Sequence, residues 1–553
     1  MTLRKLLALS VLAAWTVVGH PLDSRAADPI AALSYASFQG STSGDVSSFL
    51  GMPYATPPIG SLRFAAPQPP VTMDGIQDAT SFGAACPQQG LVLPELLPSN
   101  FSIISSGSLI SEDCLFVNIW KPASAAAGDN LPVLFWIFGG AFEIGDASLY
   151  DGALYVERSI ALGEPIILVS HNYRVNAFGF LASEELAAEN ATNIGLRDQR
   201  LAMEWVNQYI SEFGGDPDKV TIWGESAGAY SVAAHLIWND GDTGGLFRAA
   251  VMESGFPISL ANVSQGQQYY DQLVQNTGCS GASDTLSCLR ETDYTALLAA
   301  VAESPSFFSY QSLNLAWEPR IDGDIIVRNG YRYIEMGLYA KVPVIAGDCY
   351  DEGTLFSFSN ANITTDEEFL EYIHTNYITI ASDSQIEAVG EAYPADLSAG
   401  SPYDTGIFYA LTPQFKRIAS FQGDYYWQAP RRFFLSYASQ TQDTWAYLYE
   451  RGKYIPYLGA AHGTDLLEFW SDVDYIAVDA LINFATNVNP NAPSDLPSGV
   501  SLLSDITWDQ WGSDTSAPPL LTFVDPAPLV EITTDTYRAS AMNLLNELES
   551  LFP

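Results

Sequence analysis

A serine between two glycines offers the clearest chemistry in this chain. Residues 224–228 read Gly-Glu-Ser-Ala-Gly, which matches the pattern G-x-S-x-G and places Ser226 at its centre. A β-rich segment, 220–223, precedes the serine, and a helix-like segment, 229–237, follows it. At a sharp strand-to-helix turn a serine oxygen stands clear of the sheet, while flanking glycines avoid collisions with neighbouring backbone. The pentapeptide therefore predicts a nucleophilic serine, and the start of the helix favours the negative charge that develops during attack on a carbonyl group.

A second glycine-rich turn follows another apolar segment. Residues 132–138 are almost continuously apolar and lead into Gly139 and Gly140. Glycines at such a turn let the backbone approach a substrate, and successive N–H groups can then converge on one oxygen. The alternative interpretation is a simple strand-to-loop connection.

The segments that must position these turns alternate between strand-like and helix-like patterns. Short apolar or β-rich runs, typical of strands covered on both faces, recur at 166–169, 249–252, 342–345 and 444–449. Apolar residues have helical spacing at 199–210, and 537–552 has the pattern of a closing amphipathic helix. This alternation predicts an α/β fold with a mostly parallel central sheet. The largely helical stretch 257–337 is interpreted as an insertion over that sheet.

Length and composition exclude several classes of function. The chain has 553 residues, and no linker, charge block or repeat divides it, which favours one catalytic domain over 30–553. Its formal net charge of −41 repels phosphate backbones and anionic membranes. The five histidines include no His-x-x-x-His signature. We therefore expect no nucleic-acid partner, no catalytic metal and no cofactor.

The N-terminus predicts export. Arg4 and Lys5 precede an apolar run, 6–18, that is too short for a comfortable membrane span. Residues 1–19 form the predicted signal peptide, and cleavage as late as residue 27 is the alternative. No later stretch is long and apolar enough to cross a bilayer, and the C-terminus lacks a lipid-anchor signal. We expect a secreted, extracellular protein without a transmembrane anchor.

Export is consistent with the cysteines and sequons. Cys279 and Cys288 are close enough in sequence to close a small loop, Cys86 could pair with Cys114, and Cys349 is then left as a free thiol. Four Asn-x-Ser/Thr sequons are candidate glycosylation sites: Asn100, Asn190, Asn262 and Asn362.

Three longer motifs are more specific than the pentapeptide. They are FLGMPYATPPIGSLRF at 49–64, SEDCLFVNIW at 111–120 and TIWGESAG at 221–228. Together they resemble the type-B carboxylesterase/lipase family of cholinesterase-like α/β-hydrolases, and within it the secreted fungal lipases and sterol esterases of the Candida rugosa lipase type. The resemblance extends from about residue 30 to the C-terminus. It implies the α/β-hydrolase fold and a serine hydrolase of carboxylic esters.

The resemblance also implies a catalytic triad of Ser226, Glu352 and His462. Glu352 lies in Asp-Glu-Gly-Thr, which matches the acid motif of the family, and its local competitors are Asp348 and Asp351. His462 lies in a Gly-rich loop that matches the histidine motif of the family. Elimination agrees, because the other histidines either leave with the signal peptide or are expected to be structural: His20, His171, His235 and His374.

By family position, the resemblance assigns the oxyanion hole to the N–H groups of Gly140, Ala141 and Ala227. Ala141 replaces the commoner third glycine, and its methyl group is expected to narrow the site. Glu225 is interpreted either as a supporting residue beside the triad or as packing within the turn. The resemblance further implies two structural ion pairs, Arg63 with Glu112 and Arg174 with Asp198.

Between Cys86 and Cys114 the resemblance implies a disulfide-bounded lid loop at about 87–113. This loop is rich in Leu, Val and Ile, contains no Lys or Arg, and has Phe101 as its only aromatic residue. It predicts a flap with one apolar face that opens at a lipid–water interface, and the alternative is a loop packed permanently on the body. Because the loop contains no tryptophan, it cannot supply the ring of the cation–π choline site of a cholinesterase, which argues against that function.

Substrate specificity is predicted from residues around the site. The resemblance implies that Leu355 and Phe356, just after the acid motif, line the acyl site, and Phe142 is a further candidate substrate-binding residue. These residues favour a long apolar acyl site. We expect a monomer or weak homodimer that hydrolyses lipophilic esters, such as acylglycerols, sterol esters and long-chain acyl esters, through an acyl-enzyme. The alternatives are a broad-specificity or feruloyl-type esterase acting on soluble esters, and a non-catalytic adhesion protein, against which the intact triad residues argue.

Overall fold

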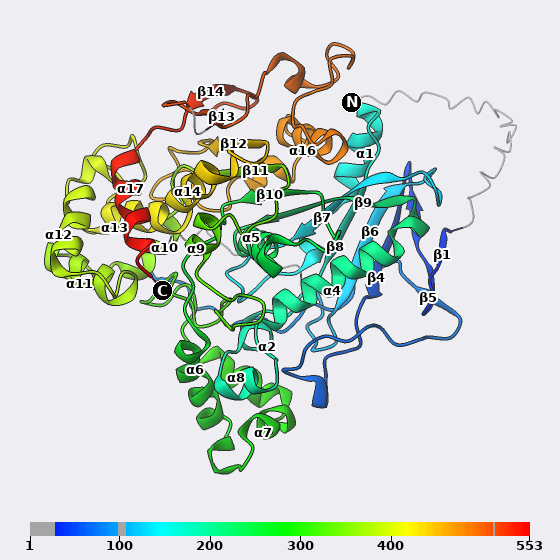
Figure 1. Ribbon diagram of the computed structural model, residues 1–553, viewed down its shortest axis with the longest axis horizontal. Coiled ribbons are helices and arrows are strands. Elements are labelled where there is room, and N and C mark those ends of the chain that lie inside the picture. The colour runs from blue at the N-terminus through cyan, green and yellow to red at the C-terminus, as the bar shows by residue number, and fades with distance from the viewer. Residues whose placement is uncertain (1–27, 98–106, 513–514, 553) are drawn as a thin grey trace, which may run out of the picture.

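The computed structural model of the protein describes residues 28–97, 107–512 and 515–552 and is built around an 11-stranded sheet (Figure 1). The strand order is β14-β13-β12-β11-β10-β9-β7-β8-β6-β4-β3. The strands are β3 (Ser41–Ser43), β4 (Val46–Pro53), β6 (Phe116–Pro122), β7 (Leu131–Ile137), β8 (Ile167–His171), β9 (Gly215–Glu225), β10 (Ala249–Glu253), β11 (Val344–Cys349), β12 (Thr444–Tyr449), β13 (Pro519–Phe523) and β14 (Val530–Thr534). A separate three-stranded sheet contains β1 (Ile30–Ala32), β2 (Ser37–Gln39) and β5 (Ile76–Asp78).

The seven neighbouring strands from β8 to β13 pair in parallel, and antiparallel pairs occur at the two edges. Every residue of β8, β10, β11 and β12 is buried, which explains why these strands are continuously apolar rather than alternating. The predicted α/β-hydrolase fold with a mostly parallel sheet is therefore confirmed. Because parallel strands point the same way, the loops after β9, β11 and β12 leave from one edge of the sheet.

Helices cover the sheet and extend beyond it. They are α1 (Ala153–Leu162), α2 (Asn176–Phe180), α3 (Glu184–Ala188), α4 (Ile194–Tyr209), α5 (Ala227–Ile237), α6 (Val263–Asn276), α7 (Thr285–Glu291), α8 (Tyr294–Ala302), α9 (Gly330–Glu335), α10 (Thr354–Ser357), α11 (Asp366–Asn376), α12 (Asp383–Ala392), α13 (Phe415–Gly423), α14 (Ala429–Ala438), α15 (Leu466–Phe469), α16 (Ile476–Asn487) and α17 (Ala539–Glu549). Helices α1 and α16 contact each other against the sheet, and α5 packs on β9 and β10. The predicted helical insertion includes α6, α7 and α8, which project together at the bottom of Figure 1.

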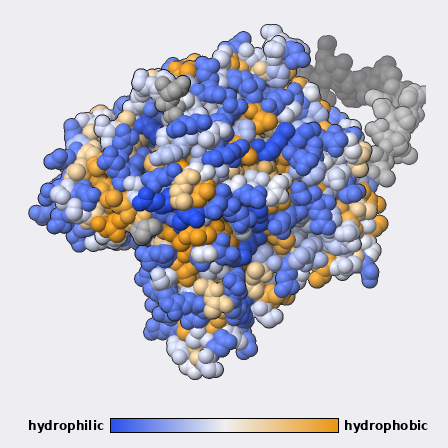
Figure 2. All heavy atoms as spheres, in the orientation of Figure 1, coloured by the Kyte–Doolittle hydropathy of each residue, from blue (hydrophilic) through white to orange (hydrophobic). Residues whose placement is uncertain are grey.

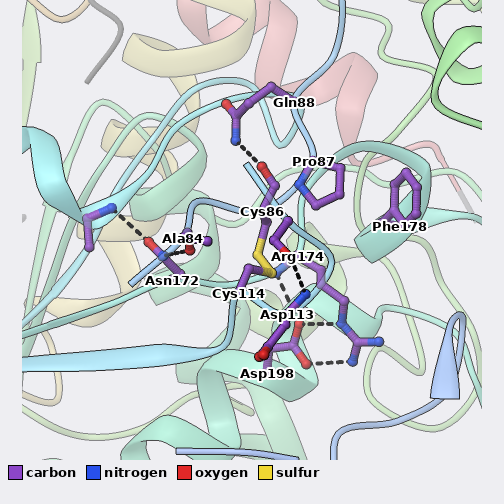
Figure 3. Close-up of a disulfide and its surroundings, with 12 residues drawn as sticks. Ala84, Cys86, Pro87, Gln88, Asp113, Cys114, Asn172, Arg174, Phe178 and Asp198 are labelled. Atoms are coloured by element: carbon purple, nitrogen blue, oxygen red, sulfur yellow. Dashed lines mark hydrogen bonds and ion pairs between the residues drawn. A yellow bond between two sulfur atoms is a disulfide. The ribbon is translucent and has the colours of Figure 1, made fainter. Parts of the chain in front are cut away.

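Both predicted disulfides are present, Cys86–Cys114 and Cys279–Cys288, and Cys349 is a buried free thiol. Figure 3 shows the first of them beside the ion pair of Arg174 with Asp198, whose atoms Nη2 and Oδ1 are 2.7 Å apart. In the other predicted pair, Arg63 donates two hydrogen bonds to the carboxylate of Glu112, at 2.6 and 2.7 Å. The disulfide joins the two ends of the 87–113 loop, and the ion pair of Glu112 with Arg63 attaches one of these ends to the body of the domain.

The surface agrees with the acidic composition. Hydrophilic residues predominate on the face seen in Figure 2, with smaller hydrophobic patches between them. Three sequon asparagines, Asn190, Asn262 and Asn362, are exposed. The predicted signal peptide, His20, Asn100 and Phe101 lie outside the described residues. None of the helices in the described ranges has the length and apolar character needed to cross a bilayer.

Candidate functional site

Ser226 lies at a strained turn between β9 and α5. Its backbone has φ 53° and ψ −123°, outside the regions that ordinary residues occupy, and its N–H donates to the carbonyl oxygen of Glu253 at 2.8 Å. A Cβ atom added to Gly228 would lie 2.0 Å from the oxygen of Ile137, and one added to Gly224 would lie 2.4 Å from the carbonyl carbon of Gly228. Both glycines of the predicted motif are therefore required by close backbone packing.

Three side chains from separate loops form one hydrogen-bonded relay. Nε2 of His462 is 2.7 Å from Oγ of Ser226, and Nδ1 of His462 is 2.5 Å from Oε2 of Glu352. The other carboxylate oxygen of Glu352 accepts from Oγ of Ser254 at 2.6 Å and from the N–H of Cys349 at 2.7 Å. Glu352 is 1% exposed, so these donors hold a buried carboxylate in one orientation.

The two acids that compete with Glu352 in the sequence are engaged elsewhere. Oδ2 of Asp348 pairs with Nε of Arg431 at 2.6 Å in the buried core. Oδ1 of Asp351 accepts from Oγ of Ser401 at 2.6 Å, and Oδ2 accepts from the N–H of Ala460 at 3.1 Å. These contacts direct both carboxylates away from a role in the relay.

Asp351 has a positioning role that the sequence analysis missed. Its own N–H donates to the carbonyl oxygen of Ala460 at 2.9 Å, so backbone and side chain together join the loop of Glu352 to the loop of His462. Gly459 makes this approach possible, because a Cβ atom there would lie 2.2 Å from Oδ2 of Asp351. Gly459, three residues before His462, was the feature of the sequence from which such a close contact could have been predicted.

Buried acids determine the charge of the imidazole. Burial alone lowers the pKa of His462, but the charge and hydrogen bond of Glu352 and the charge of Glu225 raise it to about 9. Oε1 of Glu225 is 3.6 Å from Nε2 of His462, and burial raises the pKa of Glu225 to about 8. The surroundings therefore stabilise an imidazolium ion, which is the state that forms when the histidine takes a proton from serine.

The turn after β7 lies against Ser226. Gly140, Ala141 and Phe142 all have positive φ, at 115°, 57° and 58°. A Cβ atom added to Gly139 would lie 2.9 Å from Cβ of Ser226, which shows how closely the two turns approach. Ala227 is the first residue of α5, so its N–H has no acceptor within the helix. The two glycine-rich turns therefore lie close together beside the serine.

A narrow apolar tunnel of about 70 Å³ begins at Ser226 and follows one face of α5. The helix contributes residues at helical spacing: Ser226, Ala227, Tyr230, Ala233, Ala234 and Ile237. The wall opposite consists mainly of apolar and aromatic side chains: Phe256, Pro257, Ile258, Leu260, Leu313, Leu315, Phe356, Tyr426 and Trp427. Because α5 rises about 1.5 Å per residue, the tunnel extends roughly 16 Å from the serine.

Two of the three predicted substrate-binding residues line this tunnel. Phe142 and Phe356 line it, and Leu355 does not. Neighbouring residues of α10 point in different directions, and Phe356 is the one that faces the tunnel, so a role for Leu355 stays a prediction. Ring centroids of Phe356 and Trp427 lie 5.3 and 4.6 Å from that of His462, so both rings also pack against the relay.

Several tunnel residues were missed by the sequence analysis. Tyr426 and Trp427 come from an irregular π turn (Asp424–Gln428) between α13 and α14, a region without any recognisable motif. Leu313 and Leu315 come from the helical insertion, where apolar residues are common and no spacing distinguishes those that face the substrate. The tunnel residues of α5 could have been found from the helical period that starts at Ser226: Tyr230, Ala233, Ala234 and Ile237.

The predicted lid is described only in part. Residues 87–97 and 107–113 contain no helix or strand, and residues 98–106 lie outside the described ranges. Val92 and Leu109 are 83% and 78% exposed. The N–H of Gln89 donates to the carbonyl oxygen of Glu143 at 2.9 Å, which connects this loop to the turn after β7. Opening of the loop at an interface stays a prediction.

Comparison with known proteins adds independent findings. Residues 27–518 match the model of the carboxylesterase family. The chain is 42% identical to Lipase 2 of Diutina rugosa over 489 residues, covering 85% of this chain and 86% of that one. It is 40% identical over 513 residues to the secreted triacylglycerol lipase LIP1 of Gibberella zeae, covering 89% of this chain and 86% of the relative. The crystal structure of Aspergillus niger EstA matches with a TM-score of 0.80 and 30% identity, covering 95% of this chain and 99% of that one.

Proposed function

The chain belongs to the carboxylesterase family, and on that premise we propose that it cleaves lipophilic carboxylic esters through Ser226, His462 and Glu352. Membership makes it a carboxylic ester hydrolase of the α/β-hydrolase fold. The single observation that carries the residue assignment is the double contact of His462, 2.7 Å to Ser226 and 2.5 Å to Glu352. This arrangement can move a proton between serine and imidazole while the carboxylate holds the ring in one tautomer.

The reaction follows from these contacts. His462 takes the proton of Ser226 as Oγ attacks the ester carbonyl carbon, and Glu352 stabilises the imidazolium that results. The imidazolium then donates its proton to the leaving alcohol oxygen, the ester C–O bond breaks, and the acyl group stays on Ser226. In the second half, His462 takes a proton from water as the water oxygen attacks the acyl carbon. The acyl–serine bond then breaks, His462 returns the proton to Oγ of Ser226, and the free acid departs.

Charge on the carbonyl oxygen needs its own stabilisation. We assign this role to the N–H groups of Gly140, Ala141 and Ala227, which the two turns bring beside the serine. Fixed backbone donors are effective because they need no reorganisation as the charge develops. The positive φ values at 140 and 141 and the position of Ala227 at the start of α5 support the assignment.

The tunnel supports lipophilic substrates. Its walls are mostly aliphatic and aromatic, and its length accommodates an extended acyl chain along α5. Relatives that are named lipases, one of them a secreted triacylglycerol lipase, agree with this substrate class and with release from the cell. Acylglycerols or other long-chain acyl esters are therefore the proposed substrates, and secretion is the proposed location.

Substitution of the nucleophile tests the assignment. Ser226→Ala is expected to lower kcat for p-nitrophenyl octanoate by about 10⁶-fold, because the acyl-enzyme cannot form. The variant should keep the melting temperature of the wild type and should lose labelling by a p-nitrophenyl phosphonate, read by mass spectrometry. Undiminished turnover by the alanine variant, or phosphonate attached to another residue, would disprove the assignment.

A further inference from the structure

The tunnel contains one acidic group that its apolar character does not explain. Among the described residues that line it, Glu318 alone carries a carboxyl group. A charged residue is rarely placed in such a wall, because burial away from water penalises it unless a partner compensates. The question is therefore which groups of the protein satisfy the two oxygens of Glu318.

The protein satisfies one of these oxygens. Nη1 of Arg320 lies 3.0 Å from Oε1 of Glu318, and Nη2 of Arg320 donates to the carbonyl oxygen of Leu315 at 3.0 Å. The N–H of Arg320 donates to Oδ1 of Asn193 at 2.8 Å, which fixes the backbone next to the pair. Within the described ranges, Arg320 is the ion-pair partner of Glu318, and the side chain of Glu318 keeps 14% of its surface accessible beside the tunnel.

Nearby tyrosines cannot satisfy the second oxygen. The hydroxyl of Tyr230 donates to the carbonyl oxygen of Tyr426 at 2.5 Å. The hydroxyl of Tyr426 donates to the carbonyl oxygen of Leu313 at 2.9 Å. Burial raises the pKa of both tyrosines well above the ordinary range, and the charge of Glu318 contributes to the increase in each case. Glu318 and both tyrosines line the same tunnel, and the hydroxyl donors of the tyrosines are already engaged.

The position of Tyr230 indicates the depth of this acid. Tyr230 is one turn of α5 beyond Ser226, which corresponds to about 6 Å along the helix axis. An acetyl group on Ser226 is too short to reach that level, whereas the chain of a longer acyl group passes it. Filling the tunnel with an unsubstituted alkyl chain removes water from Oε2 and offers no donor in return.

We propose that Glu318 is a specificity-determining residue that accepts a hydrogen bond from a hydroxyl group carried by the acyl part of the substrate. A carboxyl oxygen accepts such a bond whether or not the group is ionised, and Arg320 holds it in place. The substrate class is then esters of hydroxylated acids, and this assignment rests on the function proposed above. Two acyl groups supply the required chemistry, a hydroxylated aliphatic chain and a hydroxycinnamoyl group.

Matched pairs of p-nitrophenyl esters test the assignment. The first pair is octanoate and ω-hydroxyoctanoate, and the second is cinnamate and 4-hydroxycinnamate. In the wild type, kcat/KM should be at least about 10-fold higher for the hydroxylated member of one pair, because sites that bond a hydroxyl group discriminate strongly against analogues without it. The pair that shows the preference identifies the source of the hydroxyl group.

Two variants separate hydrogen bonding from folding. Glu318→Leu should reduce the ratio of kcat/KM for the hydroxylated ester to that for its unsubstituted partner to about one. The ratio should fall chiefly because kcat/KM for the unsubstituted ester rises. Because Leu leaves Arg320 without its partner, Glu318→Gln provides a second variant: its amide oxygen can still face Arg320, and the ratio should fall only in part. Glu391→Leu, an exposed position on α12, is the matched control and should keep the wild-type ratio.

The outcomes are distinct. A lower ratio in both Glu318 variants, with the ratio kept in the control, supports the assignment. A ratio near one in the wild type, or one that neither variant changes while p-nitrophenyl acetate is still hydrolysed, overturns it. Wild-type turnover of acetate without turnover of any longer ester would overturn the proposed lipophilic specificity itself, and the role of Glu318 with it.

Discussion

The relay around His462 and the tunnel along α5 meet at Ser226 but are held by different forces. In the relay, the polar atoms have directed hydrogen-bond partners. The carboxylate of Glu352, for example, accepts from three groups: His462, Ser254 and Cys349. The tunnel wall depends instead on the packing of aliphatic and aromatic side chains. Directed bonds fix atoms to within fractions of an ångström, whereas packing fixes a volume. Changes in the relay should therefore affect every ester, and changes in the tunnel should affect esters according to their acyl group.

Among changes that leave the nucleophile in place, the largest effect is expected from the acid of the relay. Glu352→Gln should lower kcat by about 10⁴-fold for short and long esters alike, because an amide can neither hold the correct tautomer nor stabilise the imidazolium. The measurement is kcat for p-nitrophenyl acetate and octanoate, with the melting temperature recorded for each variant. A loss confined to octanoate would contradict the distinction between relay and tunnel.

The neighbouring acid, Asp351, provides a control of equal burial. Asp351→Asn weakens the contacts to Ser401 and Ala460 rather than the relay. We expect the free energy of unfolding to fall by about 1–3 kcal/mol, with kcat within about 10-fold of the wild type. If Asp351→Asn lost as much activity as Glu352→Gln at a temperature where both are folded, the two acids would have been assigned the wrong roles.

The turn after β7 should show the next largest effect. Gly139→Ala introduces a Cβ atom 2.5 Å from Oε2 of Glu225 and 2.9 Å from Cβ of Ser226, so the turn must move away from the serine. Displaced donors should lower kcat/KM by about 10²–10³-fold for all esters. Gly281→Ala is the matched control, because an added Cβ atom meets nothing within 4 Å there, and its kinetics should equal those of the wild type.

The same contrast explains what could be predicted from the sequence. The residues of the relay could be predicted because a directed hydrogen bond requires a particular side chain. Ser226, Glu352 and His462 therefore occur in recognisable motifs. Packing accepts many apolar residues, so nothing in the sequence distinguished Trp427 as a tunnel residue, and nothing separated Leu355, which does not line the tunnel, from Phe356, which does. The role of Asp351 depends on a contact between two loops more than 100 residues apart in sequence, which no local pattern reveals.

The fold divides in a similar way. Strands of the parallel core were predicted because burial on both faces makes them continuously apolar, as in β10 and β12. The edge strand β14 is largely exposed and lacks this pattern, and β1, β2 and β5 have only three residues each. Short exposed strands bury too little surface to leave a clear sequence signal.

A change within the tunnel should have a smaller and selective effect. Ala234 lies on the tunnel face of α5, so Ala234→Leu extends a larger side chain into the path of the acyl chain. The ratio of kcat/KM for octanoate to that for acetate should fall by about 10-fold. Ala187→Leu, at an exposed position on α3, should leave the ratio as in the wild type. An equal loss for both esters would place the damage in the relay and contradict the separation.

The smallest expected effect is a shift in the pH dependence, and its sign follows from the charge around His462. The imidazole must be neutral to accept the proton of Ser226, so kcat/KM should rise with pH as His462 loses its own proton. The pKa of about 9 places much of this rise on the alkaline side of neutrality. Glu225 is one of the negative groups that raise the pKa of His462.

Glu225→Gln removes that negative charge and therefore makes the imidazolium less stable. The midpoint of the rising limb should move to lower pH by about one unit or less, because Glu352 still supports the protonated ring. Below pH 8 Glu225 itself gains a proton, so the wild-type limb reports the pair of groups rather than His462 alone and should be broader than that of the variant. The measurement is kcat/KM for p-nitrophenyl acetate across the pH range, with Glu391→Gln as the exposed control. A midpoint that moves to higher pH would mean that Glu225 does not act on His462 through its charge.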